Sequence, residues 1–288
     1  MKVLFWLAIF FLVVVPSATG EGIQVSWSPR EMEQGDILLV RVQTEVADTV
    51  VEGSFDKTPL YFYKEGETSF TGIVGVDMAA EPGPHSLKVM LKGRGVKPRE
   101  QVFSVPIAVG EFEVQRLTLT KELVDLQGEI LKRYLAERKK ITEIFKQVRP
   151  LKLWEYPFIR PVSGEITSTF GLRRILNGQE RSPHNGVDIG APKGAEVLAC
   201  NRGMVALAQE LCLEGNTIII DHGFGLYSIY MHLSEIRVKE GDQVARGACI
   251  GLVGATGRVT GPHLHWGVKL LGARVDPFAL LRLGTPEG

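Results

Sequence analysis

Neither sign of charge is in excess in this sequence, which balances 33 Lys and Arg residues against 33 Asp and Glu residues in 288. Proteins that bind nucleic acids neutralise phosphates with a surplus of basic side chains. The balanced composition therefore argues against a nucleic-acid partner. It also leaves no net field to steer a charged polymer toward the protein, so we expect recognition to depend on a local groove.

Cysteines are few, and none is arranged for metal binding. The chain has three, Cys200, Cys212 and Cys249, and no pair has the CxxC spacing of a zinc site. An odd number allows at most one disulfide within the chain. Cys200 and Cys249 lie in apolar runs typical of strands, so we expect them to pack as free thiols. The HExxH motif, whose Glu is the general base of many zinc peptidases, is also absent.

Long hydrophobic runs are absent except at the N-terminus, where apolar residues extend from Val3 to Val15 after Met1 and Lys2. This run is shorter than the ~20 residues that span a bilayer. Small residues follow it at 17–20, so residues 1–20 have the layout of a signal peptide cleaved near Gly20. An uncleaved N-terminal anchor is the alternative. Both predict export, to the periplasm or to a secreted, cell-wall-associated location, without stable membrane insertion after cleavage.

Two kinds of structure are predicted before residue 150. Residues 21–115 contain short β-rich runs, such as 37–42, 69–76 and 86–91, separated by Gly-containing turns, which predicts an immunoglobulin-like β-sandwich acting as an accessory domain. Residues 118–149 have apolar side chains at steps of three and four, with Thr120 as N-cap and Pro150 after the end. This pattern predicts an amphipathic helix that links two domains.

Glycine is the one residue in surplus, and the surplus is local. Of 32 glycines, 20 lie from Gly164 onward, in a region of β-rich runs and tight turns. The predicted second domain, residues 150–288, is therefore a Gly-rich antiparallel sheet, and the whole chain is predicted to be mainly β. Five of the six histidines share this region: His184, His222, His232, His263 and His265.

The histidines have spacings that suit a metal site. His263 and His265 are two residues apart in an alternating stretch, and residues two apart on a strand face the same side. His184 and Asp188 are four apart beside Gly186, so an extended segment also places them on one side. Zinc accepts imidazole nitrogen and carboxylate oxygen, and catalytic sites use three protein ligands. His184, Asp188 and one histidine of the pair supply such a set.

Five motifs follow one another in this domain. They are Ser168-Thr169-Phe170-Gly171-Leu172-Arg173, His184-Asn185-Gly186-Val187-Asp188, Tyr230-Met231-His232-Leu233, Gly254-Ala255-Thr256-Gly257 and Gly261-Pro262-His263-Leu264-His265-Trp266. In this order they resemble the lysostaphin/LytM zinc endopeptidases, which cut peptides of peptidoglycan. The resemblance covers about residues 161–277.

The resemblance implies roles that spacing alone leaves open. It implies that His184, Asp188 and His265 bind Zn²⁺, and that His232 and His263 assist catalysis without binding the metal. It implies an enzyme that hydrolyses peptide bonds in peptidoglycan stem peptides or cross-links. The alternative is a non-catalytic LytM-like regulator that activates other hydrolases, but the complete set of ligands and histidines favours an enzyme.

Three further residues are candidates for substrate binding, because peptidoglycan stem peptides present carboxylates and amides. They are Arg173, Asn177 and Asn216. His222 lies between predicted strands, and we interpret it as part of a surface turn. The sequence leaves open which bond is cut, whether the enzyme is an endopeptidase or a carboxypeptidase, and whether the N-terminal half inhibits the site.

Overall fold

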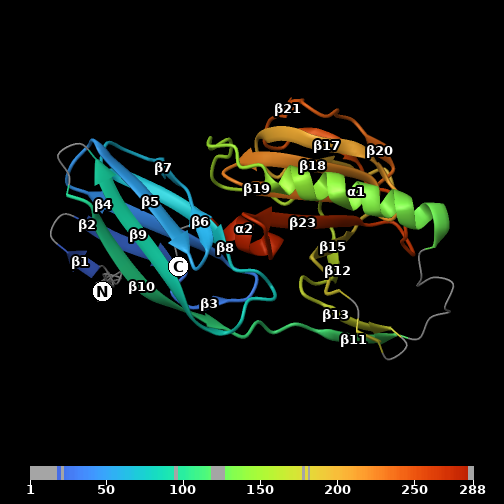
Figure 1. Ribbon diagram of the computed structural model, residues 1–288. Helices are drawn as coiled ribbons and strands as arrows, with labels where there is room; N and C mark the ends of the chain where they lie inside the picture. Colours follow the sequence, from blue (N-terminus) through green and yellow to red (C-terminus); the bar gives the residue numbers. More distant parts are fainter. Residues whose placement is uncertain are drawn as a thin grey trace, which may run out of the picture.

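The computed structural model describes residues 18–20, 23–93, 97–117, 127–176, 179–180 and 182–284. Strands dominate these residues and two helices accompany them (Figure 1), which confirms the predicted mainly-β class. Of the predicted signal peptide, residues 1–17 lie outside the described part of the chain. Residues 18–20 form strand β1 (Ala18–Gly20), so cleavage near Gly20 stays a prediction.

The N-terminal half contains two five-stranded sheets that enclose one apolar core. The first has the order β1, β2 (Ile23–Ser28), β4 (Ile37–Thr44), β8 (Ser69–Gly75), β7 (Phe62–Lys64). The second has the order β3 (Met32–Glu33), β10 (Arg99–Ala108), β9 (Gly83–Gly93), β5 (Thr49–Phe55), β6 (Thr58–Leu60). Two facing sheets agree with the predicted sandwich, whereas its immunoglobulin-type strand order stays a prediction.

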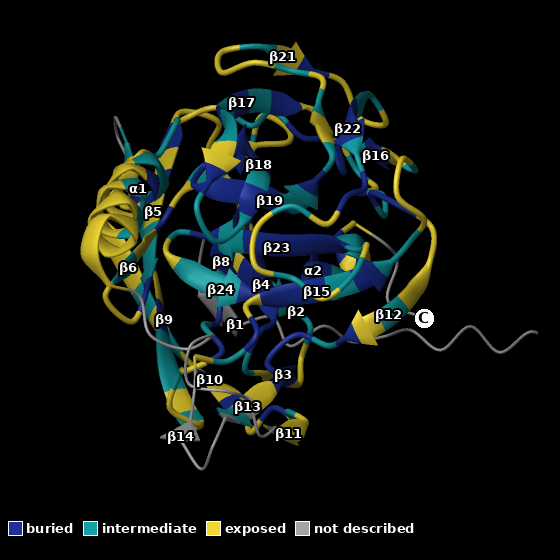
Figure 2. Cartoon of the chain, turned by 90° about the vertical axis from the view of Figure 1, so that its right-hand side faces the viewer, coloured by how far each residue is buried: buried dark blue, intermediate teal, exposed yellow. Residues whose placement is uncertain are grey.

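The C-terminal half is built on one large sheet. Its order is β12 (Glu165–Ser168), β15 (Gly186–Gly190), β23 (Leu264–Leu270), β19 (Leu226–Leu233), β18 (Gly215–Gly223), β17 (Gly203–Leu211), β21 (Gln243–Val244), with β24 (Ala273–Val275) beside β23. A second sheet has the order β16 (Glu196–Leu198), β22 (Cys249–Leu252), β20 (Glu235–Ile236). Strands β15, β19 and β23 are mostly buried (Figure 2).

The two halves share a core because β4 is buried on both of its faces. Leu38 and Val40 point into the sandwich, whereas Ile37 and Leu39 pack with apolar residues of the C-terminal sheet. The alternation of side chains along a strand explains why residues 37–40, the first half of β4, are apolar at every position. The sequence interval 37–42 was correctly predicted to be a strand, but its second buried face requires a partner domain.

Polar contacts reinforce this junction. The guanidinium of Arg274 donates to both carboxylate oxygens of Asp77, at 3.0 and 2.6 Å. Arg282, at the end of helix α2 (Pro277–Arg282), donates to Asp36 at 2.9 Å. These pairs join the sandwich to the strand and helix that end the C-terminal half. The predicted boundaries, 21–115 and 150–288, stay predictions, since the apolar core crosses from one range into the other.

The long helix is shorter than predicted. Helix α1 extends over Gly128–Lys146, and residues 118–126, with the expected N-cap Thr120, lie outside the described residues. Residues 147–149 are not helical, and the α conformation is disfavoured for Arg149, which directly precedes Pro150. Ile141 is the buried residue of α1 and belongs to an apolar cluster with strands β17, β18 and β19. Among the described residues, no helix combines the length and apolar character needed to span a membrane.

Candidate metal centre

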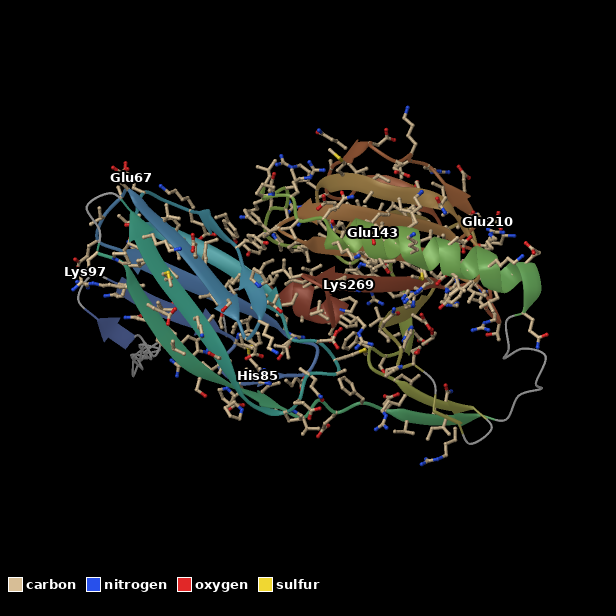
Figure 3. The ribbon with its side chains drawn as sticks, viewed as in Figure 1. Glu67, His85, Lys97, Glu143, Glu210 and Lys269 are labelled. Atoms are coloured by element: carbon tan, nitrogen blue, oxygen red, sulfur yellow. The ribbon has the colours of Figure 1, made fainter. Side chains whose placement is uncertain are left out.

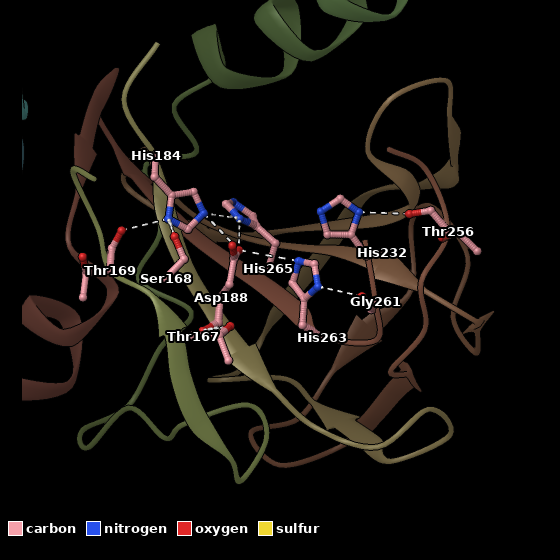
Figure 4. A network of polar contacts seen from close by, with 10 residues as sticks. All are labelled: Thr167, Ser168, Thr169, His184, Asp188, His232, Thr256, Gly261, His263 and His265. Atoms are coloured by element: carbon pink, nitrogen blue, oxygen red, sulfur yellow. Dashed lines mark hydrogen bonds and ion pairs between the residues drawn. The ribbon is translucent and has the colours of Figure 1, made fainter. Parts of the chain in front are cut away.

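Three ligand-type side chains meet on neighbouring strands of the large sheet (Figure 4). Asp188 on β15 is the register partner of His265 on β23, and His184 precedes β15. The Oδ1 atom of Asp188 lies 3.0 Å from His184 Nε2 and 2.9 Å from His265 Nδ1, and the two nitrogens are 3.0 Å apart. Among the described residues, this is the one group of His, Cys, Asp and Glu atoms close enough to hold a metal ion.

The orientation of His184 is fixed by the chain segment that follows β12. The Nδ1 atom of His184 lies 2.8 Å from the carbonyl oxygen of Thr169 and 3.1 Å from Ser168 Oγ. A carbonyl oxygen can only accept, so Nδ1 carries the proton and donates it. The Nε2 atom of His184 therefore has a free lone pair, and it faces Asp188. Backbone contacts of this kind commonly orient metal-binding histidines.

The three atoms fit a small divalent cation. Tetrahedral ligands at ~2.0–2.1 Å from zinc lie ~3.3 Å from one another, slightly more than the 2.9–3.0 Å observed between these atoms. Burial raises the pKa of Asp188, but hydrogen bonds with His184 and His265 lower it by more, so the carboxylate is ionised at neutral pH. An anion facing lone pairs at such short range is stabilised by a cation between them.

Two more imidazoles lie beside this group. The ring of His263 has Nε2 3.8 Å from Asp188 Oδ1, and the ring centroids of His232 and His263 are 4.9 Å apart. His263 donates from Nδ1 to the carbonyl of Gly261, at 2.9 Å, and His232 donates from Nδ1 to the carbonyl of Thr256, at 3.0 Å. Burial lowers the pKa of His232 to about 4.

The side chains of the HxH pair follow the alternation of a strand. Leu264 and Trp266 are fully buried in the core, while His263 and His265 point to the opposite side, as the alternation predicts. His265 is the closer of the two to Asp188 because it is the direct register partner. His263 lies before β23 and forms an isolated bridge with Gly254.

The three substrate-binding candidates differ in what surrounds them. Arg173 is exposed at the start of β13 (Arg173–Leu176). This strand directly follows Leu172, whose carbonyl accepts from the backbone N–H of His184. Asn177 lies outside the described residues. The side chain of Asn216 donates to the carbonyl of Leu233 at 3.0 Å, and its backbone N–H donates to Thr256 Oγ1. Asn216 thus holds the loop next to His232.

The interpretation of His222 as a surface residue was wrong. Its side chain is completely buried at the end of β18. Nδ1 donates to the carbonyl of Arg202 at 2.8 Å, and Nε2 lies 2.7 Å from Ser228 Oγ. The turn-like sequence around it concealed that β17 and β19 flank its strand. The expected free cysteines are observed, with Cys200 buried and Cys212 and Cys249 partly buried.

The groups that orient these side chains were not predicted from the sequence. The carbonyl of Thr169 has no signature in a sequence, because every residue carries a carbonyl. Gly186, in contrast, can be recognised in the sequence, because a glycine between His184 and Asp188 indicates a close approach of another group. A Cβ at Gly186 would lie 2.8 Å from Nε2 of His265 and 2.5 Å from the carbonyl oxygen of Trp266, so the ring of His265 occupies space that only glycine leaves open.

Comparisons with known proteins identify a peptidase family. Residues 182–277 match Peptidase family M23. A relative in Vibrio cholerae, "Peptidoglycan DD-endopeptidase ShyA", is 43% identical over 112 residues, which are 38% of this chain and 26% of the relative. The chain therefore spans about a quarter of the length of that curated relative.

Two solved structures are also similar. A crystal structure of an M23 peptidase candidate from Pseudomonas aeruginosa has a TM-score of 0.67 and 30% identity, and the match covers 87% of this chain and 95% of that one. The catalytic domain of lysostaphin from Staphylococcus simulans is 31% identical, over 45% of this chain and 91% of that chain, with a TM-score of 0.33. The first of these matches includes both halves of the present fold.

Proposed function

The chain belongs to peptidase family M23, and we propose that it is a zinc metalloendopeptidase that hydrolyses peptide bonds in peptidoglycan stem peptides or cross-links. The observation that carries the proposal is the group of three ligand atoms within about 3 Å of one another, with two further histidines beside it. A relative that is a peptidoglycan DD-endopeptidase supports the choice of substrate.

The donor set suits zinc. Two imidazole nitrogens and one carboxylate oxygen are ligands of catalytic zinc sites, which keep a fourth position open. We assign the metal to Nε2 of His184, Oδ1 of Asp188 and Nδ1 of His265. When bound, zinc would supply a Lewis acid that polarises the scissile carbonyl and lowers the pKa of water. The partly buried carboxylate of Asp188 would offset part of the ion's charge, and it contacts both facing rings.

We assign proton transfer to His232 and His263. Each ring donates its Nδ1–H to a backbone carbonyl, so the Nε2 atom of a neutral ring has a lone pair that can accept a proton. The lowered pKa of His232 keeps this ring neutral near pH 7. The pair can then take a proton from the attacking water and return it to the leaving amine. Stabilisation of the oxyanion by a histidine requires that the ring has first been protonated.

The test is digestion of purified peptidoglycan, followed by mass spectrometry of the muropeptides and measurement of bound zinc. We expect wild-type protein to bind one zinc and to release new amino groups. His184→Ala and Asp188→Ala should lose both properties, because each removes a ligand. His263→Ala should keep zinc and lose turnover by about 10²–10⁴-fold, the usual contribution of a general base.

A matched control is His85→Ala, which removes a histidine on β9 of the N-terminal half (Figure 3). This variant should keep both zinc and activity. Full digestion by Asp188→Ala would contradict the metal assignment, and loss of zinc in His263→Ala would mean that the roles of the HxH pair are reversed. Wild-type protein that binds zinc but releases no amines would favour the non-catalytic regulator.

The location and division of the chain belong to the same proposal. Action on peptidoglycan fits removal of residues 1–20 and a periplasmic or secreted, cell-wall-associated protein. Residues 21–115 would form the accessory sandwich and residues 150–288 the peptidase domain. Mass measurement of the exported protein tests the cleavage site, because it shows whether residues 1–20 are lost. Cleavage near Gly20 would also remove strand β1, which pairs with β2.

A further inference from the structure

The segment that leaves the sandwich is bound to the chain that carries the metal ligand His184. Strand β11 (Val114–Leu117) pairs in parallel with β13, with Val114 as the partner of Arg173. The backbone N–H of Arg173 also donates to the carbonyl of Glu113 at 2.8 Å. In Figure 1, β11 and β13 lie side by side below β12 and β15. The described part of the link between the two halves thus includes a strand that pairs with the C-terminal half.

The side chain of Phe112 anchors this strand. Its ring meets the ring of Phe170 edge-on, with centroids 6.1 Å apart and an interplanar angle of 71°. It also lies directly over Gly171, whose φ is +74°, so that a Cβ at Gly171 would collide with the ring. A cavity of about 210 Å³ adjoins Phe112, Phe170 and Thr169. Truncation of the ring would enlarge this cavity, which the surrounding chain could collapse into.

The backbone that Phe112 covers is the backbone that holds His184. The carbonyl of Thr169 accepts from Nδ1 of His184 at 2.8 Å. The N–H of Gly171 donates to the carbonyl of His184 at 2.8 Å, and the N–H of His184 donates to the carbonyl of Leu172 at 3.0 Å. A shift of residues 169–172 toward the enlarged cavity would therefore move the imidazole and its backbone together.

We propose that Phe112 is a positioning residue for the metal centre: by fixing residues 169–172 it holds Nε2 of His184 toward Asp188 and His265. The inference rests on the proposed function, since it assumes that these three atoms bind zinc. Phe112 does not touch the ligands. The segment between the domains would act on the metal site only through residues 169–172. Residues that orient metal ligands without binding the metal themselves typically change metal affinity by 10–100-fold when they are removed.

The experiment measures zinc affinity of the full chain by competition with a chromophoric chelator. Phe112→Ala should raise the zinc dissociation constant by at least about tenfold. Phe112→Leu keeps an apolar side chain over Gly171 and should recover most of that affinity. Hydrogen exchange of the metal-free protein gives a second readout, because the amides of Gly171 and His184 should exchange faster in Phe112→Ala.

The matched control is Phe103→Ala, which removes another half-buried phenylalanine ring. Phe103 packs on Trp27 in the sandwich, with centroids 5.4 Å apart, so its loss should lower stability without changing zinc affinity. Unchanged affinity in Phe112→Ala, or equal losses in both alanine variants, would overturn the inference. A wild-type chain that binds no zinc would instead overturn the proposed function, so the two failures are distinguishable.

Discussion

A buried histidine outside the metal site should make the stability of this protein sensitive to acid. His222 is completely buried, and its two ring nitrogens are matched to Arg202 and Ser228. The carbonyl of Arg202 can only accept, so Nδ1 is protonated. Nε2 lies 2.7 Å from Ser228 Oγ, whose hydroxyl donates to Tyr230, and 3.8 Å from Cys200 Sγ. The hydrogen-bonding partners of the ring are thus all neutral groups. Burial accordingly lowers the pKa of His222 to about 4.

The sign and size of the effect follow from linkage. The folded protein disfavours the protonated ring, whereas the unfolded chain titrates near the ordinary histidine pKa of about 6.5. The contribution of His222 to stability is therefore complete above pH 6.5 and is lost as the pH falls from 6.5 toward 4. A difference of about 2.5 pKa units corresponds to about 3 kcal/mol, of which about 2–3 kcal/mol should be lost by pH 4.5.

The assay compares urea unfolding of wild type and His222→Gln at pH 7.5 and pH 4.5, with a chelator present so that loss of metal does not contribute. Glutamine can donate and accept but does not titrate in this range. Because the main core includes residues from both halves, we expect one cooperative transition. Wild type should lose about 2–3 kcal/mol more than the variant between the two pH values. An equal loss in both proteins would refute the reasoning.

Three further predictions concern the metal and the domain junction. Gly186→Ala should weaken zinc binding, because its Cβ would collide with the ring of His265, whereas Gly261→Ala adds a methyl group in open space and should leave zinc affinity unchanged in the same titration. Arg274→Ala should lower the free energy of unfolding by about 2 kcal/mol, measured with urea, because Asp77 would lose a two-point hydrogen-bonded partner in a half-buried position. Removal of zinc should lower the melting temperature of wild type, and zinc at 1,000 times its dissociation constant should restore about 4 kcal/mol in calorimetry.

The parts of the site that could be predicted depend on regular strands. The spacing of His263 and His265 was informative because side chains alternate along a strand, and this segment is straight enough for the rule to hold. The spacing of His184 and Asp188 was informative because an even number of residues on an extended segment also places two side chains on one side. His184 itself lies just before β15. The choice of His265 as the ligand came from the family resemblance. This choice stays a prediction, and the structure shows that His265 is the register partner of Asp188.

The parts that could not be predicted depend on long-range packing. His222 has the local sequence of a turn, and only the registration of β18 between β17 and β19 reveals that it is buried. Phe112 lies in a segment without a recognisable pattern, and its role follows from Gly171, about 60 residues later in the chain. Local propensity cannot report either contact, because both partners must first be brought together by the fold.

The shared core bears on whether the sandwich could inhibit the site by swinging toward and away from it. Four apolar side chains of the N-terminal half, Ile37, Leu39, Ile73 and Met78, are at most 5% exposed and pack into the core of the C-terminal half. Exposure of such side chains costs about 1.5–3 kcal/mol each, so separation of the halves would cost on the order of 6–12 kcal/mol before any ion pair is broken. Fewer than about one molecule in 10⁴ would then be open at equilibrium. The sandwich is thus fixed against the C-terminal half. We expect any control that it exerts on the site to act through small shifts of β11, which pairs with β13 near His184.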